Sequence, residues 1–254
     1  MTLLFLRIIP AITAFFSFLA ALWQWVHPLN YPWPLVWFGV WVVFASFILV
    51  WRHLSWRDAL DKLIPFFITL LSLGLGFLVV GSFFGRLVLT ALFIGIPYFI
   101  LELLFLLIHA PARYPVNGLS RFNIALVPVA TLFFAASLNG LNVGLRLPWW
   151  IITGAFCIFG AALFFFTAHP TASRVHRLRW SALGGLVGAH IGILEWVLPL
   201  SMFAQGALAA FLLFVPLRFR RYLYQPQPAR RVAWSESVLA SVCFLVILIS
   251  ARWI

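Results

Sequence analysis

Charged residues are scarce in this chain of 254 residues, of which Asp, Glu, Lys and Arg together make up only 9%. Ordinary globular domains carry about 25% charged residues. A water-exposed surface cannot be built from so few, and 65% of the chain is hydrophobic, with a mean hydropathy of +1.09. The composition therefore excludes a soluble protein and predicts an integral membrane protein.

Acidic residues and cysteines are scarcer still, with 5 Asp and Glu and 2 Cys in the whole chain. Cys157 and Cys243 both fall within apolar stretches, so we expect buried thiols rather than a disulfide. The sequence has no glycine-rich phosphate loop, no Ser/His/Asp set and no paired-cysteine motif. We therefore expect no cofactor and no nucleic-acid partner, and we assign no catalytic residue.

Long apolar runs dominate what is present. A spanning helix needs about 20 apolar residues to cross a hydrocarbon core of roughly 30 Å. The sequence predicts nine such helices, at residues 3–26, 34–51, 63–84, 87–108, 122–143, 147–168, 180–198, 200–217 and 235–253. Only short loops and ends remain between them. We expect an all-α fold, a polytopic transmembrane helix bundle that occupies residues 1–254 as one membrane domain with no soluble domain.

The basic residues predict how this bundle is oriented. If the N-terminus is cytoplasmic, all but three of the 17 Lys and Arg residues fall on the inner side. The three on the outer side are Arg86, Arg146 and Arg252. Because cytoplasmic loops of membrane proteins carry the excess of Lys and Arg, we expect a cytoplasmic N-terminus and an outer C-terminus.

Two short patterns recur at a similar distance along the chain. Pro10-x-x-Thr13-x-Phe15-Phe16 recurs as Pro128-x-x-Thr131-x-Phe133-Phe134, and Pro32-Trp33 recurs as Pro148-Trp149. The pattern is typical of two parallel four-span repeats, 3–108 and 122–217, followed by a final span at 235–253. Chance similarity in a chain rich in Phe and Pro is the alternative. A true duplication would favour a site at the interface of the repeats.

Ionisable residues inside a membrane are the first functional candidates, and Glu102, His190 and Glu195 qualify. The two glutamates lie some 16 Å apart along the membrane normal, too far for a catalytic carboxylate pair. His190 and Glu195 are five positions apart and do not share the helix face that a zinc site needs. We expect no metal site, and a neutral His190 that is hydrogen-bonded to a neighbouring helix.

Structural pairing explains both glutamates more simply. Arg7 lies at a depth similar to that of Glu102, so we expect the first and fourth spans to be neighbours, with Arg7 and Glu102 in contact or bridged by water or Tyr98. Snorkelling of each side chain to the membrane surface is the alternative to this contact. Arg146 lies at a depth that would satisfy Glu195. The alternative for each glutamate is a role with a substrate or a proton. A transporter would line an outer cavity with Asn139, Asn142, Arg146 and Glu195.

Three glycines, Gly184, Gly188 and Gly192, form one stripe along the seventh predicted span. Without Cβ atoms, two helix backbones approach closely, which is how many membrane helices associate. The stripe predicts a tightly packed helix pair. Glu195 shares the face of the stripe, and His190 points the other way.

The cytoplasmic loops offer two further hypotheses. Arginines beside the last spans predict contacts with anionic lipid headgroups, and they are Arg218, Arg220, Arg221, Arg230 and Arg231. The loop 52–62 predicts a short interfacial helix. Intramembrane prenyltransferases place the aspartates that bind magnesium diphosphate in such a loop, where this chain has Asp58-x-x-Asp61. The expected Asn/Asp pattern is missing here, and the matching loop 168–179 contains no acidic residue, so the resemblance is one of architecture only.

Several stretches in the last two thirds of the chain are similar to one family. They include Pro111-Ala112-Arg113-Tyr114-Pro115, Leu147-Pro148-Trp149, Glu195-Trp196-x-Leu198 and Ala251-Arg252-Trp253. Together they resemble uncharacterised multi-span inner-membrane proteins of small-genome, candidate-phyla bacteria. The resemblance implies a location in the bacterial cytoplasmic membrane and implies no activity.

We therefore expect a non-catalytic structural or partner-binding membrane component that contacts membrane lipids, with a protein partner as a further option. A small transporter or lipid-handling protein is the alternative. An intramembrane enzyme that transfers prenyl or phosphoryl groups is a more remote one.

Overall fold

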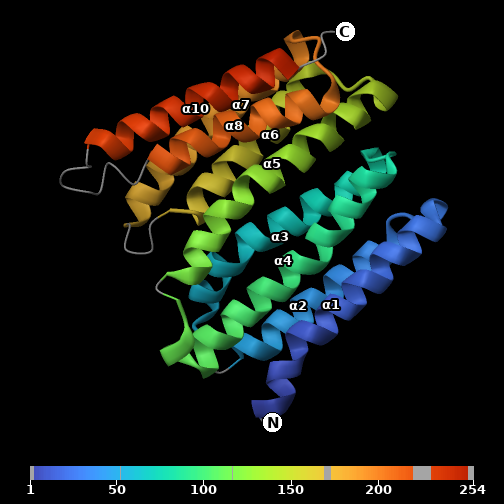
Figure 1. Cartoon of the computed structure of the whole chain (residues 1–254), viewed down its shortest axis with the longest axis vertical. Coiled ribbons are helices and arrows are strands. Elements are labelled where there is room, and N and C mark those ends of the chain that lie inside the picture. The colour runs from blue at the N-terminus through green and yellow to red at the C-terminus, as the bar shows by residue number, and fades with distance from the viewer. Residues whose placement is uncertain (1–2, 52, 116, 169–172, 220–229, 251–254) are drawn as a thin grey trace. The chain divides into compact units, whose positions relative to one another are not determined.

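The computed structural model describes residues 3–51, 53–115, 117–168, 173–219 and 230–250. Within these ranges the chain is all-α, as predicted, with no β-strand. Two short 3-10 helices, Pro28–Asn30 and Pro111–Arg113, lie between the longer elements. The α-helices (Figure 1) are α1 Leu3–Val26, α2 Trp33–Val50, α3 Trp56–Val79, α4 Phe83–His109, α5 Gly118–Leu145, α6 Trp149–Phe166, α7 Arg174–Val197, α8 Met202–Phe219 and α10 Arg230–Ser250.

Seven of these helices, α1 to α6 and α8, are long and apolar enough to cross a membrane. The chain is therefore a multi-pass membrane protein. Each of the nine predicted runs corresponds to one helix, although the run 63–84 extends past the end of α3 at Val79 into the start of α4. Glycines, His190 and Glu195 lower the hydropathy of α7, which therefore falls below this measure. For α10, the residues whose side chains are described give a shorter apolar stretch, Trp234–Ile247.

Serine caps set the start of three helices. The side chains of Ser55, Ser82 and Ser173 accept hydrogen bonds from backbone N–H groups at the starts of α3, α4 and α7. Such caps satisfy donors that have no partner within the helix. The cap at Ser55 corrects the predicted interfacial helix at 52–62, because α3 begins at Trp56 and continues without a break to Val79.

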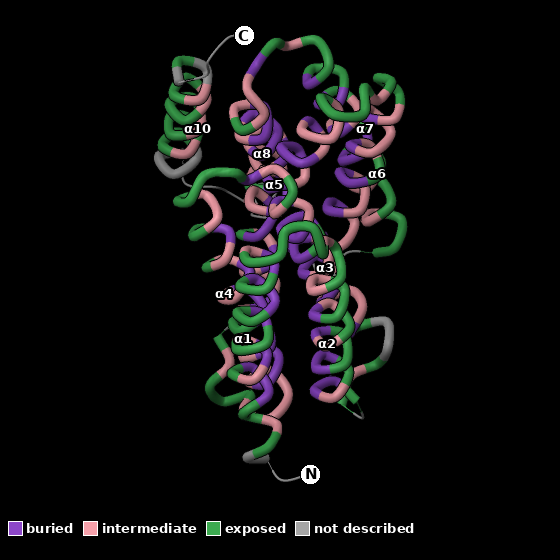
Figure 2. Tube along the Cα trace, turned by 90° about the vertical axis from the view of Figure 1, so that its right-hand side faces the viewer, coloured by how far each residue is buried: buried purple, intermediate pink, exposed green. Residues whose placement is uncertain are grey.

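The chain divides into two compact units, unit 1 at Met1–Asn123 and unit 2 at Ile124–Ile254. In unit 1, α4 is the central helix, because α1, α2 and α3 all pack against it. Phe93 of α4 is fully buried, with its ring centroid 4.8 Å from that of Phe38 and 5.5 Å from that of Phe77. α2 has buried residues along one side and exposed residues along the other (Figure 2).

In unit 2, α6 and α7 form the most extensively packed pair, and α8 packs against both α7 and α10. The predicted glycine stripe lies at the α6–α7 contact. A Cβ atom at Gly188 would overlap the carbonyl oxygen of Phe156, and one at Gly192 would stand 2.6 Å from the Cα atom of Thr153. The prediction of a tightly packed helix pair is confirmed.

Both cysteines are free, but Cys243 is exposed on α10 rather than buried. The start of unit 2 falls within two residues of the start of the second predicted repeat at 122. The internal duplication itself stays a prediction.

Candidate functional site

The polar centre of unit 2 is a cluster of three side chains from three helices. Glu195, near the end of α7, is only 7% exposed, and Asn139 of α5 is 5% exposed. The amide of Asn139 donates a hydrogen bond to Oε2 of Glu195. The amide of Gln205, on α8, donates to the backbone carbonyls of Glu195 and Leu198, each at 2.8 Å. Two of the residues predicted from sequence are thus brought together.

These hydrogen bonds join α5, α7 and α8, so the cluster has a clear structural effect. Gln205 was not among the sequence candidates. The feature of the sequence that points to Gln205 is a strongly polar side chain within an apolar helix. Because this side chain is uncharged, it was not among the ionisable candidates.

The predicted contact between Arg146 and Glu195 is wrong. Arg146 is exposed, and no basic side chain in the described ranges lies within 4.0 Å of the Glu195 carboxylate. Arg146 has a φ of 50° and its N–H donates to the carbonyl of Asn142 at 2.8 Å. A residue in this left-handed conformation ends a helix. The position of Arg146 is therefore explained by the end of α5.

The predicted neighbours α1 and α4 do pack together, but the predicted Arg7–Glu102 pair is wrong. Arg7 is exposed, Glu102 is half-buried, and neither forms a hydrogen bond or ion pair within the described part of the chain. The buried face of α1 carries Ile9, Thr13 and Ser17. At about 100° per residue, Arg7 lies about 160° from Ile9 but only about 80° from Ser17, so it lies beside the buried face and not on it.

His190 also differs from the prediction. It is exposed on α7, away from the buried glycine stripe, which confirms its predicted direction. Its Nδ1 atom lies 2.8 Å from the carbonyl oxygen of Leu186 on the same helix, so the expected bond to a neighbouring helix is wrong.

The arginines proposed to contact headgroups are described only in part. Arg218 forms an ion pair with Glu236 of α10 at 3.0 Å, with 49% of the Arg218 side chain exposed. Arg220 and Arg221 lie outside the described residues, as do the side chains of Arg230 and Arg231. Contact with headgroups stays a prediction for all five.

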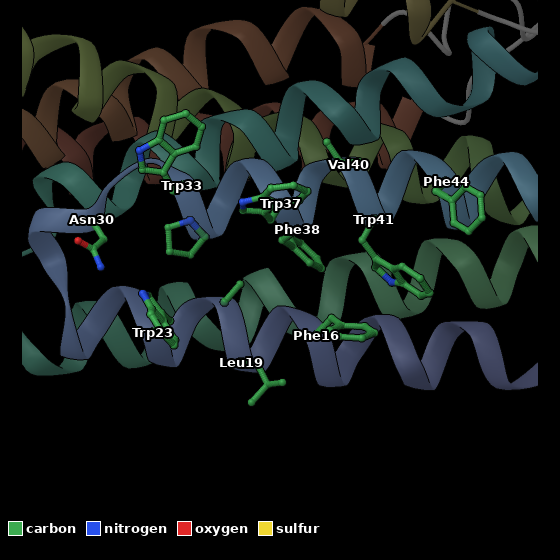
Figure 3. A pocket seen from close by; sticks show the side chains of 12 residues that line it. Phe16, Leu19, Trp23, Asn30, Trp33, Trp37, Phe38, Val40, Trp41 and Phe44 are labelled. Carbon is green, nitrogen blue, oxygen red and sulfur yellow. The ribbon is translucent and has the colours of Figure 1, made fainter.

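Unit 1 has a different kind of candidate site, formed by apolar hollows beside α2. A groove of about 730 Å³ runs between α1 and α2 and is lined by aromatic rings (Figure 3). Two more hollows, of about 930 Å³ and 380 Å³, lie between α2 and α3. The residues that line the three hollows include no charged side chain.

The sequence search missed these hollows, although one signal was present. Trp33, Trp37 and Trp41 follow one another at intervals of four residues, which places them on one side of a helix. Searches against protein-family models, curated proteins and solved structures found no match.

Proposed function

We propose that the protein is a non-catalytic component of the bacterial cytoplasmic membrane that binds membrane lipids through unit 1. The observation that carries the proposal is the incomplete packing around α2, where three apolar hollows border a single helix. The hollows are open at the surface of unit 1, because exposed side chains line them, among them Trp37 in the first hollow and Val43 in the other two. Lipid chains are as apolar as a Leu side chain and surround a spanning helix on its open sides.

The acidic residues support a non-catalytic role. Glu195 is hydrogen-bonded to Asn139, and Asp58 accepts a hydrogen bond of 2.6 Å from Ser55 at the start of α3. Asp58 was the first acid of the prenyltransferase-like pattern, and here its carboxylate belongs to a helix cap. Within the described residues, no group of three or more His, Cys, Asp or Glu side chains is placed to hold a metal ion.

The transporter alternative needs free polar groups along a path. Instead, Asn139 and Glu195 are buried and bonded to each other, and Arg146 points away into an exposed position. These are three of the four residues predicted to line an outer cavity, the fourth being Asn142. Their arrangement favours the lipid-binding function.

Native mass spectrometry of the full chain tests this function. In mild detergent, we expect phospholipids to remain bound to the protein after the detergent solution is exchanged repeatedly.

Gly39 borders the smallest of the three hollows, and a Cβ atom there meets nothing within 4 Å. Gly39→Leu should therefore fill that hollow and remove about one retained lipid per chain, without unfolding the protein. Gly154→Leu on α6 is the matched control, because a Cβ at Gly154 also meets nothing within 4 Å. A folded wild type that loses every lipid on the first exchange would refute the function.

The orientation is part of the proposal and rests on the asymmetric distribution of Lys and Arg. Single cysteines placed at positions 118, 174 and 225, in a chain whose two native cysteines are changed to Ala, should all react from the cytoplasmic side only. Labelling of any one of them from outside would contradict the proposed orientation.

A further inference from the structure

Two aromatic rings meet across the groove between α1 and α2, near the end that Phe44 lines. The ring centroids of Phe16 and Trp41 lie 4.9 Å apart across the two helices. The indole N–H of Trp41 donates to the Thr13 hydroxyl at 3.1 Å, which holds this contact in place. The other end of the groove lies at the turn between the helices, where Trp23, Asn30 and Trp33 line it (Figure 3).

The groove has the length of one lipid leaflet. Its lining on α2 runs from Trp33 to Phe44, eleven residues along the helix. At 1.5 Å per residue this is about 16 Å. Half of a hydrocarbon core of roughly 30 Å is about 15 Å. The groove therefore reaches from the turn, at one membrane interface, to about the middle of the membrane.

The groove is open on the outer faces of two helices that are long and apolar enough to cross a membrane. Among the residues that line it, Leu19 is 41% exposed and Val40 is 57% exposed. Lipid hydrocarbon chains surround a spanning helix on its open sides. An extended acyl chain is therefore the occupant that matches the position and the apolar lining of the groove.

Hydrogen-bond donors gather at the end beside the turn. The indole N–H groups of Trp23, Trp33 and Trp37 and the side-chain amide of Asn30 have no acceptor among the described residues. Figure 3 shows the three indole nitrogens at the ends of the rings nearer Asn30. The ester and phosphate oxygens of a phospholipid accept hydrogen bonds, and Trp is enriched at membrane interfaces for this reason.

We propose that the groove binds one acyl chain of a diacyl glycerophospholipid from the leaflet on the side of the α1–α2 turn. The chain lies over Phe38 and Ala20, between Leu19 and Trp37, and its glycerol esters and phosphate accept hydrogen bonds from the donors at the turn. No Lys or Arg lines the groove, so the site recognises acceptor oxygens rather than net charge. This inference rests on the proposed lipid-binding function and assigns it a site, a leaflet and a ligand.

Photolabelling of the full chain in phospholipid vesicles tests the site. The probes are two phospholipids with a diazirine in the middle of one acyl chain, one zwitterionic and one anionic. Adducts are mapped by peptide mass spectrometry, and those on Phe16 and Leu19 are compared with those on Ile158. Ile158 is 73% exposed on α6 and reports contact with bulk lipid. We expect Phe16 and Leu19 to be labelled about tenfold more than Ile158 by both probes, at low and high salt alike.

Trp33→Ala with Trp37→Ala should remove this preference, because both side chains line the groove. These side chains are 65% and 71% exposed, so their loss leaves the core intact. Trp149→Ala with Trp150→Ala is the matched control at the start of α6, where the side chains are 52% and 61% exposed, and it should leave the labelling of Phe16 unchanged.

Equal labelling of Phe16, Leu19 and Ile158 in the wild type would overturn the inference, as would a copurified protein that shields the groove from both probes. A preference for the anionic probe that salt abolishes would also overturn it. If native mass spectrometry still finds retained lipid in any of these cases, the lipid-binding function stands and only the site is wrong. Loss of all retained lipid would refute the function itself.

Discussion

At the α6–α7 contact of unit 2, no side chain separates the two backbones around Gly188, whereas in unit 1 the rings of Phe16 and Trp41 lie between α1 and α2. Small residues let helices approach until their backbone atoms touch. Large rings hold helices apart, and where the rings do not fill the space between them a hollow remains. The difference explains why the candidate binding site is in the aromatic unit and not in the glycine-rich one.

Polar side chains join helices in both units, but with different groups. Asn139, Glu195 and Gln205 form hydrogen bonds between α5, α7 and α8 in unit 2. In unit 1, the indole N–H of Trp41 donates to the Thr13 hydroxyl, which joins α1 and α2. The link in unit 2 therefore includes a buried carboxyl group, whereas the link in unit 1 is made by uncharged groups.

The largest expected effect is on stability: the same substitution, Gly→Ala, should destabilise the protein at a position in unit 2 and stabilise it at a position in unit 1. Gly188→Ala should destabilise the protein by about 3 kcal/mol, because its Cβ overlaps the Phe156 carbonyl and the backbones must separate. Gly39→Ala should stabilise it by up to about 1 kcal/mol, because Ala is the better helix former. Thermal unfolding in one detergent measures both, with Gly154→Ala as the control for an uncrowded glycine. Equal shifts at positions 39 and 188 would remove the packing difference between the units.

The second largest effect concerns the buried hydrogen bond of unit 2. Asn139→Leu should cost about 2 kcal/mol, because it leaves the Glu195 carboxyl buried without its donor. Glu195→Leu together with Asn139→Leu should cost less than Asn139→Leu alone, since no unpaired group then remains. The measurement is again thermal unfolding in detergent. Asn142→Leu, on the same helix but outside the cluster, is the control and should change stability by no more than about 0.5 kcal/mol. Similar losses at positions 139 and 142 would argue against a special cluster.

A smaller effect is expected where α8 meets α10. Arg218 and Glu236 form an ion pair at 3.0 Å, but about half of the Arg218 side chain is exposed. Solvent screens such a pair, so the coupling energy should be at most about 1 kcal/mol. Arg218→Gln, Glu236→Gln and the double variant give this coupling, and high salt should reduce it further. A coupling that is large and independent of salt would mean that the pair is buried in the membrane-bound protein.

Local features of the sequence were predictable. The apolar runs gave the positions of the helices, because each run is long enough to span a membrane on its own. The stripe Gly184, Gly188 and Gly192 predicted a close contact because its spacing places all three on one face. Asn139 and Glu195 could be grouped because the loop positions placed both near the same membrane surface.

Features that depend on helix rotation or on empty space were not predictable from one sequence. Depth alone suggested that Arg7 faces Glu102, but rotation about α1 places Arg7 beside its buried face and not on it. The hollows beside α2 depend on which residues lie across from Trp33 and Trp37, and no pattern within α2 contains that information. Gln205 was missed because a buried amide has no charge to draw attention to it.

The smallest expected effect is the coupling between Arg7 and Glu102, which provides the contrast to the Asn139–Glu195 pair. Because neither side chain has a partner within the described part of the chain, Arg7→Leu and Glu102→Leu should be additive to within about 0.5 kcal/mol. Glu102→Leu alone should be neutral or stabilising, since it removes a half-buried acid from a spanning helix and exposes no new donor. Arg7 can extend its long side chain to the membrane surface, so its loss should cost little stability.

A double-mutant cycle, in the detergent used for Asn139 and Glu195, measures the coupling energy between Arg7 and Glu102. Coupling above about 1 kcal/mol would mean that the two side chains meet in the membrane after all. Additive effects of Arg7 and Glu102 beside strong coupling of Asn139 and Glu195 would show that Glu195, unlike Glu102, is held by a polar side chain of another helix.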